Sequence, residues 1–101
     1  MVNILLVCSA GMSTSMLVKK MQEAAAKDGI EANIWAVGDA ESPTNAPKAD
    51  VIMLGPQVRF LEKKMKDLVK DAKPVQVIDM ASYGTMNGEK VLKQALSLIG
   101  K

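Results

Sequence analysis

The sequence predicts an α/β fold with an open four-stranded parallel sheet, order 2-1-3-4, and helices on both faces. Short, continuously apolar runs of branched residues recur along the chain, which is typical of strands buried on both faces. Longer segments with apolar residues at helical spacing lie between them. Because strands and helices alternate, the strands are expected to run parallel, and right-handed crossovers leave few possible strand orders.

The first strand is expected at residues 4–7, an apolar run that stops at Cys8. A helix is expected at about 14–28, where apolar residues recur at helical spacing and Asp28-Gly29 supplies a stop signal. The second strand is expected at 30–37, a half-apolar run. These three elements form the first strand-helix-strand unit.

Residues 38–49 contain two prolines and several small polar residues, so a loop, or at most one helical turn, is expected there. The third strand, 51–54, repeats the design of the first. After Gly55-Pro56-Gln57 an amphipathic helix is expected. Its buried stripe would consist of Val58, Leu61, Met65 and Leu68.

The fourth strand is expected at residues 75–78, where the leading Pro74 and the interrupting Gln76 suit an edge position. Residues 79–87 are expected to be irregular. A last helix is expected at 88–99, with apolar residues along one side. In the order 2-1-3-4, the first and last helices then cover one face of the sheet and the middle helix covers the other.

The candidate site lies at the topological switch point of this sheet. The carboxyl ends of strands one and three diverge there, and open α/β sheets bind their ligands at such points. Cys8 and Gly55-Pro56-Gln57 both fall at this edge. Two segments far apart in the sequence are therefore expected to meet around one thiol.

Residues 8–15 are predicted to form a strand-to-helix loop that binds an anion. Glycine lets the backbone turn tightly, and hydroxyls and the N–H groups of the first helical turn can converge on one phosphoryl group. Convergent amides also favour the reactive thiolate, whereas a cysteine without such a loop is more often a packing residue. The predicted site consists of the nucleophile Cys8 and the phosphate-binding residues Ser9, Ala10, Gly11, Met12, Ser13, Thr14 and Ser15.

Composition excludes several classes of function. The chain has 101 residues, 49% of them hydrophobic, which fits a single domain over residues 1–101. A net charge of +2 and three aromatic residues do not favour nucleic-acid binding. One cysteine and no histidine leave no internal disulfide and no Cys/His metal cluster, so neither a metal nor a cofactor is expected and a reducing compartment fits. No apolar stretch is long enough for membrane insertion.

Three alternatives for the loop can be compared by their residues. A Walker phosphate loop needs a lysine directly after its second glycine, and the lysines here begin only at Lys19. A low-molecular-weight cysteine phosphatase has the loop Cys-x5-Arg-Ser/Thr, but Thr14 stands at the arginine position, and no Asp-Pro acid follows late in the chain. A flavodoxin-like site would have only Tyr83 to stack on the flavin. A phosphoryl carrier is favoured, and the phosphatase is the second candidate.

The amino-acid sequence of the loop and its flanks resembles that of a known protein family. Residues 3–17, NILLVCSAGMSTSML, resemble the opening of enzyme IIB subunits of the bacterial phosphotransferase system, in the lactose/cellobiose/chitobiose family. Val51-Ile52-Met53-Leu54-Gly55-Pro56-Gln57, Val77-Ile78-Asp79 and Tyr83-Gly84 also resemble later segments of that family. The likeness covers nearly the whole chain except residues 38–48, and it is closer to cellobiose and chitobiose members than to lactose members.

The resemblance implies a cytoplasmic phosphotransferase that associates with the membrane only through a partner. Cys8 would take a phosphoryl group from a phosphohistidine on a IIA subunit and pass it to a sugar, such as cellobiose or chitobiose, bound by the membrane subunit IIC. Residues 9–15 would hold the phosphocysteine, and Pro56, Gln57 and Tyr83 would border the site and face the partner proteins. No base for the sugar hydroxyl is visible beside Cys8, so we expect the membrane partner to supply it.

Overall fold

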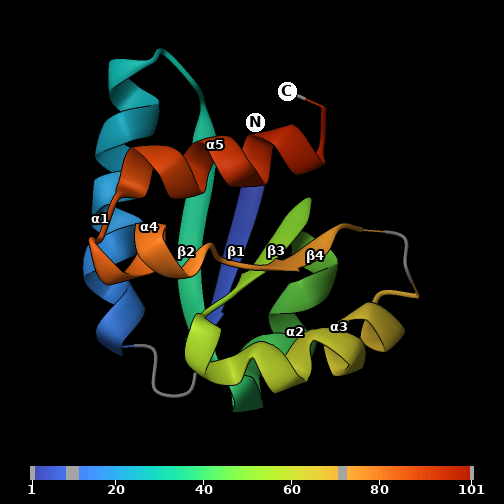
Figure 1. Cartoon of the computed structure of the whole chain (residues 1–101). Coiled ribbons are helices and arrows are strands. Elements are labelled where there is room, and N and C mark those ends of the chain that lie inside the picture. The colour runs from blue at the N-terminus through green and yellow to red at the C-terminus, as the bar shows by residue number, and fades with distance from the viewer. Residues whose placement is uncertain (1, 9–11, 71–72, 101) are drawn as a thin grey trace.

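A parallel sheet forms the centre of the molecule in the computed structural model, which describes residues 2–8, 12–70 and 73–100. Its four strands in this part of the chain lie in the order β2-β1-β3-β4, as predicted (Figure 1). Their bounds are β1 Val2–Cys8, β2 Ala32–Gly38, β3 Val51–Leu54 and β4 Val75–Val77. All three pairings are parallel, so the carboxyl ends of the strands share one edge.

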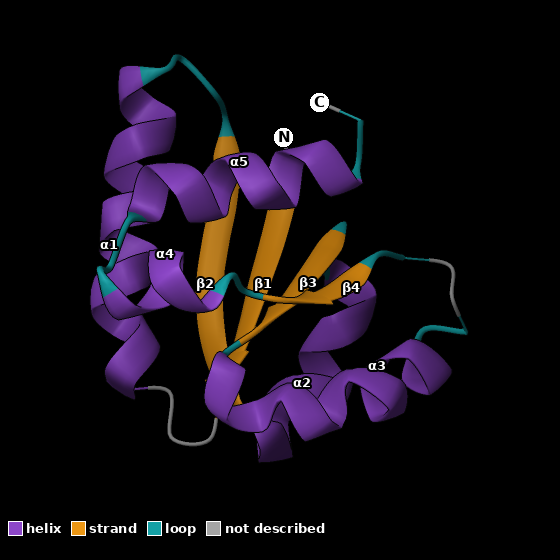
Figure 2. Ribbon diagram, viewed as in Figure 1, coloured by secondary structure: helices purple, strands orange, loops and turns teal. Residues whose placement is uncertain are grey.

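The central strand β1 sends alternate side chains to opposite faces of the sheet. Ile4 and Leu6 pack with the helices α1, Met12–Lys27, and α5, Gly88–Leu98. Leu5 and Val7 pack on the other face against residues of the helical segments that precede and follow β3. The predicted two-sided burial is therefore confirmed, and Figure 2 shows the sheet enclosed by helices.

Helices α1 and α5 approach each other closely at Gly88. A Cβ on this glycine would stand 2.5 Å from the carbonyl carbon of Lys20 and 2.6 Å from the backbone nitrogen of Met21. Contacts of this length leave no room for a side chain, so glycine permits the packing. The contact fixes α1, the helix that follows the predicted phosphate-binding loop.

The start of the first helix differs from the prediction. Helix α1 begins at Met12, so residues 12–15 of the predicted loop form its first turn. Small polar residues such as serine and threonine favour both loops and helix starts, and apolar periodicity becomes visible only further along the helix. Most other element boundaries move by one or two residues.

The segment between β2 and β3 was predicted as a loop or at most one helical turn, and this is wrong. It forms successive short turns: η1 Asp39–Glu41, α2 Ser42–Asn45 and η2 Ala46–Lys48. Pro43 and Pro47 each lie in a first turn, where a missing N–H removes no helical hydrogen bond. The prolines therefore mark where turns begin and do not prevent them.

The helix expected after β3 is divided into two segments. The 3-10 segment η3, Pro56–Leu61, contains a non-helical residue, Val58, and α3 follows over Glu62–Leu68. Val58, Leu61 and Met65 are buried as predicted, but Leu68 is 41% exposed. Leu68 is the last residue of α3, so the buried stripe ends one turn earlier.

The segment 79–87, predicted to be irregular, contains a short helix. Helix α4 spans Met80–Gly84, and the carboxylate of Asp79 accepts a hydrogen bond of 3.0 Å from the backbone N–H of Ser82. This is an N-cap, which satisfies a donor that a helix start otherwise leaves unpaired. The helix is too short for periodicity to reveal it.

Candidate active site

Cys8 ends β1 at the carboxyl edge of the sheet, where its register partner on β2 is Gly38. Its side chain is buried. Ser9, Ala10 and Gly11, together with the side chains of residues 12–14, lie outside the described part of the chain. Ser15 is exposed in the first turn of α1. The structure thus places Cys8 at the end of the central strand, four residues before the first residue of α1.

Gly55 brings the next segment against Cys8. Its N–H donates to the carbonyl of Val7 at 2.9 Å, which continues the pairing of β1 with β3 by one residue. A Cβ on Gly55 would stand 3.6 Å from the Cβ of Cys8 and 2.7 Å from Oε1 of Gln57. The amide of Gln57 therefore occupies the space that a side chain at Gly55 would fill, next to Cys8.

Gln57 also reaches across to the segment after β4. Its Nε2 donates a hydrogen bond of 2.8 Å to the hydroxyl of Tyr83, which belongs to α4. Tyr83 is half-buried and packs against the core between the sheet and helices α1 and α5. The structure therefore brings the predicted residues Gln57 and Tyr83 together, while Pro56 begins the helical turns of η3.

Three residues that were not predicted as site residues, Asp79, Ser82 and Gln94, hold α4 in place. The N–H and the hydroxyl of Ser82 both donate to Asp79 at 3.0 Å, and the N–H of Asp79 donates to Gln94 of α5 at 3.1 Å. These hydrogen bonds lower the pKa of Asp79. The bond from the N–H of Ser82 has the larger effect, and the bond from the Ser82 hydroxyl has the next largest. An aspartate three residues before a serine, directly after an expected strand, was the available signal.

An open cleft of about 720 Å³ lies beside the hydrogen bond between Gln57 and Tyr83. Two large apolar side chains of its lining, Phe60 and Met80, are 74% and 66% exposed. The lining residues are Pro56, Gln57, Arg59, Phe60, Met80, Tyr83 and Gly84. Every predicted border residue of the site therefore contributes to one partly apolar surface.

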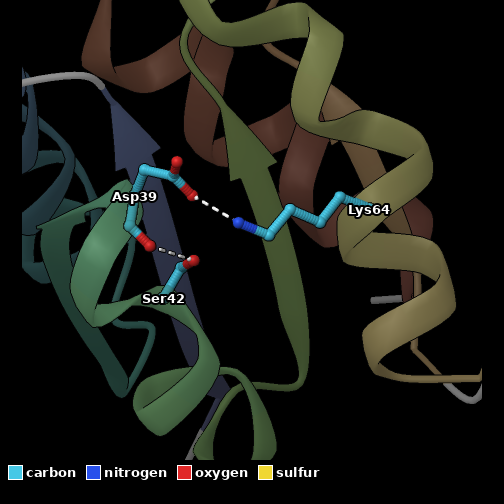
Figure 3. A network of polar contacts seen from close by, with 3 residues as sticks. All are labelled: Asp39, Ser42 and Lys64. Atoms are coloured by element: carbon cyan, nitrogen blue, oxygen red, sulfur yellow. Dashed lines mark hydrogen bonds and ion pairs between the residues drawn. The ribbon is translucent and has the colours of Figure 1, made fainter.

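A polar network lies next to the end of β2, the strand that pairs with β1 on the edge opposite to β3 (Figure 3). Lys64 of α3 lies 3.2 Å from a carboxylate oxygen of Asp39, and the hydroxyl of Ser42 donates to the Asp39 carbonyl at 2.7 Å. Asp39 directly follows Gly38, the register partner of Cys8. The ion pair is largely exposed, so we expect it to contribute at most about 1 kcal/mol to stability.

Two further findings concern the described residues only. None of their Cys, Asp and Glu side chains gather in a group of three or more that could bind a metal ion. No helix formed by these residues is long and apolar enough to cross a membrane.

Comparison with known proteins identifies the family. Residues 3–94 match the family model described as PTS system, lactose/cellobiose specific IIB subunit. The oligo-beta-mannoside-specific EIIB component of Bacillus subtilis (strain 168) is 48% identical over 100 residues, which cover 98% of this chain and 97% of the relative. The galactose-specific EIIB component of Lactococcus lactis subsp. cremoris (strain MG1363) is 45% identical over 102 residues, which cover 95% of this chain and 94% of the relative.

A solved structure supports the same assignment. The solution structure of the cellobiose-specific phosphotransferase IIB component of Borrelia burgdorferi has a TM-score of 0.79 and 42% identity, and the match covers 96% of this chain and 90% of that one. The predicted family, fold and phosphotransferase class are confirmed, and the cysteine phosphatase is not favoured. The chain belongs to the lactose/cellobiose-specific IIB family of the phosphotransferase system, a sugar-specific phosphotransferase component of the kind that works with IIA and IIC partners.

Proposed function

We propose that this chain is a phosphoryl carrier in which Cys8 is the phosphorylated residue. The observation that carries the proposal is the position of Cys8 at the end of the central strand, where the segment after β3 packs against it and Gln57 of that segment is hydrogen-bonded to Tyr83 after β4. The donor is a phosphohistidine of a IIA subunit, and the acceptor is a sugar bound by the membrane subunit IIC. The chain acts as one IIB domain over residues 1–101, on the cytoplasmic side of the membrane.

The first transfer exchanges a nitrogen–phosphorus bond for a sulfur–phosphorus bond. The Cys8 thiolate attacks phosphorus, the bond to the histidine nitrogen breaks, and the imidazole leaves with its electron pair. The thiolate needs no general base, and residues 9–15 neutralise the charge of the phosphoryl oxygens with hydroxyls and amides. Positioning and charge neutralisation therefore provide the catalysis.

The second transfer regenerates the thiolate. A sugar hydroxyl attacks phosphorus, the sulfur–phosphorus bond breaks, and the hydroxyl proton passes to a base on the membrane partner. Thr14 stands where a cysteine phosphatase has its arginine. A loop without that arginine stabilises the hydrolytic transition state less well, so the phosphocysteine persists until an acceptor arrives.

The cleft beside Gln57 and Tyr83 is the docking surface for the partner proteins. Phe60 and Met80 offer exposed apolar anchors there, and Arg59 adds a positive charge at the same surface. Because Cys8 is buried, side chains around it must move before a donor reaches the sulfur.

The sugar is proposed to be a β-linked disaccharide such as cellobiose or chitobiose. The sequence of residues 8–15 supports this choice, and so does the name of the Borrelia burgdorferi structure. Other relatives are named for an oligo-beta-mannoside and for galactose, so members of the family differ in the sugar for which they are named.

Sugar phosphorylation by membrane vesicles that contain the IIC partner tests the proposal. The vesicles are supplied with a IIA protein, the proteins that phosphorylate IIA, and this protein. Cellobiose or chitobiose should then be phosphorylated, and the rate should fall to background when this protein carries Cys8→Ser. Phosphorylation of galactose alone would contradict the assignment of the sugar. Undiminished phosphorylation with Cys8→Ser would contradict the carrier role itself.

A further inference from the structure

We propose that Gln57 contacts the phosphoryl group on Cys8 and that Tyr83 is the positioning residue that holds Gln57 there. The inference rests on the carrier function proposed above, and it concerns residues outside the predicted loop 9–15. Three observations support it: the close approach of the Gln57 amide to Gly55, the hydrogen bond to Tyr83, and the anchoring of Tyr83 in the core.

The Gln57 amide is a neighbour of Cys8 because Gly55 has no side chain. Oε1 and Cδ of Gln57 lie 2.7 and 3.3 Å from the point where a Gly55 Cβ would stand, and the Cβ of Cys8 lies 3.6 Å from the same point. The amide and the cysteine thus pack against one backbone position. A phosphoryl group on the sulfur would extend from this position towards the carboxyl edge of the sheet.

The hydroxyl of Tyr83 restricts where the amide can go. Gln57 is exposed, and an exposed glutamine ordinarily samples several rotamers. Tyr83 is less mobile, because its ring packs against the core and its helix is capped by Asp79. The hydrogen bond of 2.8 Å therefore ties a side chain on η3 to a fixed point on α4.

This hydrogen bond can reverse its direction. A tyrosine hydroxyl both donates and accepts, and a glutamine amide presents an oxygen on one side and an NH₂ group on the other. In the unphosphorylated chain, Nε2 of Gln57 donates to Tyr83 and Oε1 lies over Gly55. Rotation of the amide by half a turn would let Tyr83 donate to Oε1 and would place Nε2 beside Cys8.

A phosphoryl group on Cys8 favours the reversed orientation. Its oxygens carry negative charge, which repels a carbonyl oxygen and attracts an N–H donor. The reversed amide would donate to a phosphoryl oxygen from Nε2 and accept from Tyr83 at Oε1, so both ends of the amide would be paired. Phosphorylation thus changes the direction of the Gln57–Tyr83 hydrogen bond, and a phenylalanine at position 83 could not donate in the new direction.

Rapid-quench measurement of phosphoryl transfer from a phosphorylated IIA protein tests these roles. Tyr83→Phe should slow transfer by roughly threefold to tenfold, the loss expected for one hydrogen bond. Gln57→Leu should slow it by about tenfold to a hundredfold, as expected for a bond to a charged group. Thr85→Val is the matched control, because Thr85 also belongs to the α4 region but its hydroxyl donates to the Ala81 carbonyl at 2.9 Å. It should transfer within about twofold of the unmodified protein.

A double-mutant cycle separates positioning from a structural role. If Tyr83 acts through Gln57, adding Tyr83→Phe to Gln57→Leu should cause no further loss of rate. Phosphorylation should also shift the Gln57 side-chain amide signals in ¹⁵N NMR spectra, and this shift should be smaller in Tyr83→Phe than in Thr85→Val. Additive losses of rate, or equal shifts in both variants, would overturn the proposal.

The rapid-quench measurement of phosphoryl transfer also distinguishes this inference from the proposed function. If the unmodified chain gains a phosphoryl group on Cys8 while Tyr83→Phe transfers as fast as Thr85→Val, the carrier function stands and the roles of Gln57 and Tyr83 fall. If the unmodified chain gains no phosphoryl group on Cys8 from its cognate IIA protein, both proposals are overturned.

Discussion

The amide of Gln57 lies in the space that Gly55 leaves empty, with Oε1 only 2.7 Å from where a Gly55 Cβ would stand. The contact between Gly55 and Gln57 lies next to Cys8, so it links the segment after β3 to the candidate site. The backbone angles of Gly55, φ −61° and ψ 146°, are accessible to any residue. The glycine is therefore required for space and not for backbone freedom, which leads to the first prediction.

Gly55→Ala should impair phosphoryl transfer while leaving the fold intact. The new methyl group would displace the far end of a flexible side chain, so we expect a loss of stability below about 1 kcal/mol. Displacement of the Gln57 amide should slow transfer from phosphorylated IIA by about tenfold. Urea unfolding and rapid-quench transfer measure the two effects. An unfolded variant, or one that transfers at the unmodified rate, would show that the close approach has another purpose.

Gly88→Ala should destabilise the whole chain. Its Cβ would meet the backbone of Lys20 and Met21, which cannot move aside as a side chain can, so α1 and α5 must separate. We expect a loss of about 1–3 kcal/mol in the free energy of unfolding, measured by urea denaturation. Gly84→Ala is the control for stability, because nothing lies within 4 Å of its Cβ position. Equal effects of the two substitutions would contradict the packing described for α1 and α5.

Asp79 should give the protein a pH-dependent stability in acid. The hydrogen bonds from Ser82 lower the pKa of Asp79 in the folded chain below the ordinary value of 3.8 for an unperturbed aspartate. The contribution is therefore fully present above the unfolded value and is lost as the pH falls through the lower folded value. Asparagine also caps helices but does not titrate. Urea unfolding of Asp79→Asn should consequently depend less on pH than unfolding of the unmodified protein.

The control for this effect is Asp67→Asn, since Asp67 is exposed and does not cap a helix. It should retain the acid-dependent loss of stability of the unmodified chain. If Asp79→Asn loses stability in acid as steeply as Asp67→Asn, the cap does not contribute through its charge.

Phe60→Ala should weaken binding of the IIA partner. Phe60 is 74% exposed in the cleft beside Gln57, so truncation removes docking area but little core packing. We expect roughly tenfold weaker binding by isothermal titration calorimetry and an unchanged midpoint of thermal unfolding. Leu68→Ala provides the comparison, because Leu68 is an exposed apolar residue outside this cleft. Weakening of equal size in both variants would contradict a docking surface at the cleft.

The sequence predicted the sheet and the two packed faces because long-range burial leaves a periodic pattern. The runs at 4–7 and 51–54 are apolar throughout, and the buried residues of α5 repeat at helical spacing. Helix α4 has only five residues, so its capping residue Asp79 was its main signal. The prolines of α2 and η2 were interpreted as breaks although they lie at permitted positions.

The site was predicted only in part. Cys8, Gln57 and Tyr83 were predicted to lie at one edge of the sheet, but their geometry depends on contacts that no local pattern contains. Gln57 and Tyr83 are 26 residues apart in the chain, and their hydrogen bond exists because β3 and β4 end at the same edge of the sheet. The role of Gly55 likewise becomes visible only when the Gln57 side chain is placed above it.

Intact-protein mass spectrometry with peptide mapping, after incubation with the phosphorylated cognate IIA protein, tests the phosphocarrier role of Cys8 most directly. We expect a gain of one phosphoryl group, located on Cys8 and lost in Cys8→Ala. A phosphoryl group mapped to Ser13, Thr14 or Ser15, or one that persists in Cys8→Ala, would contradict this role.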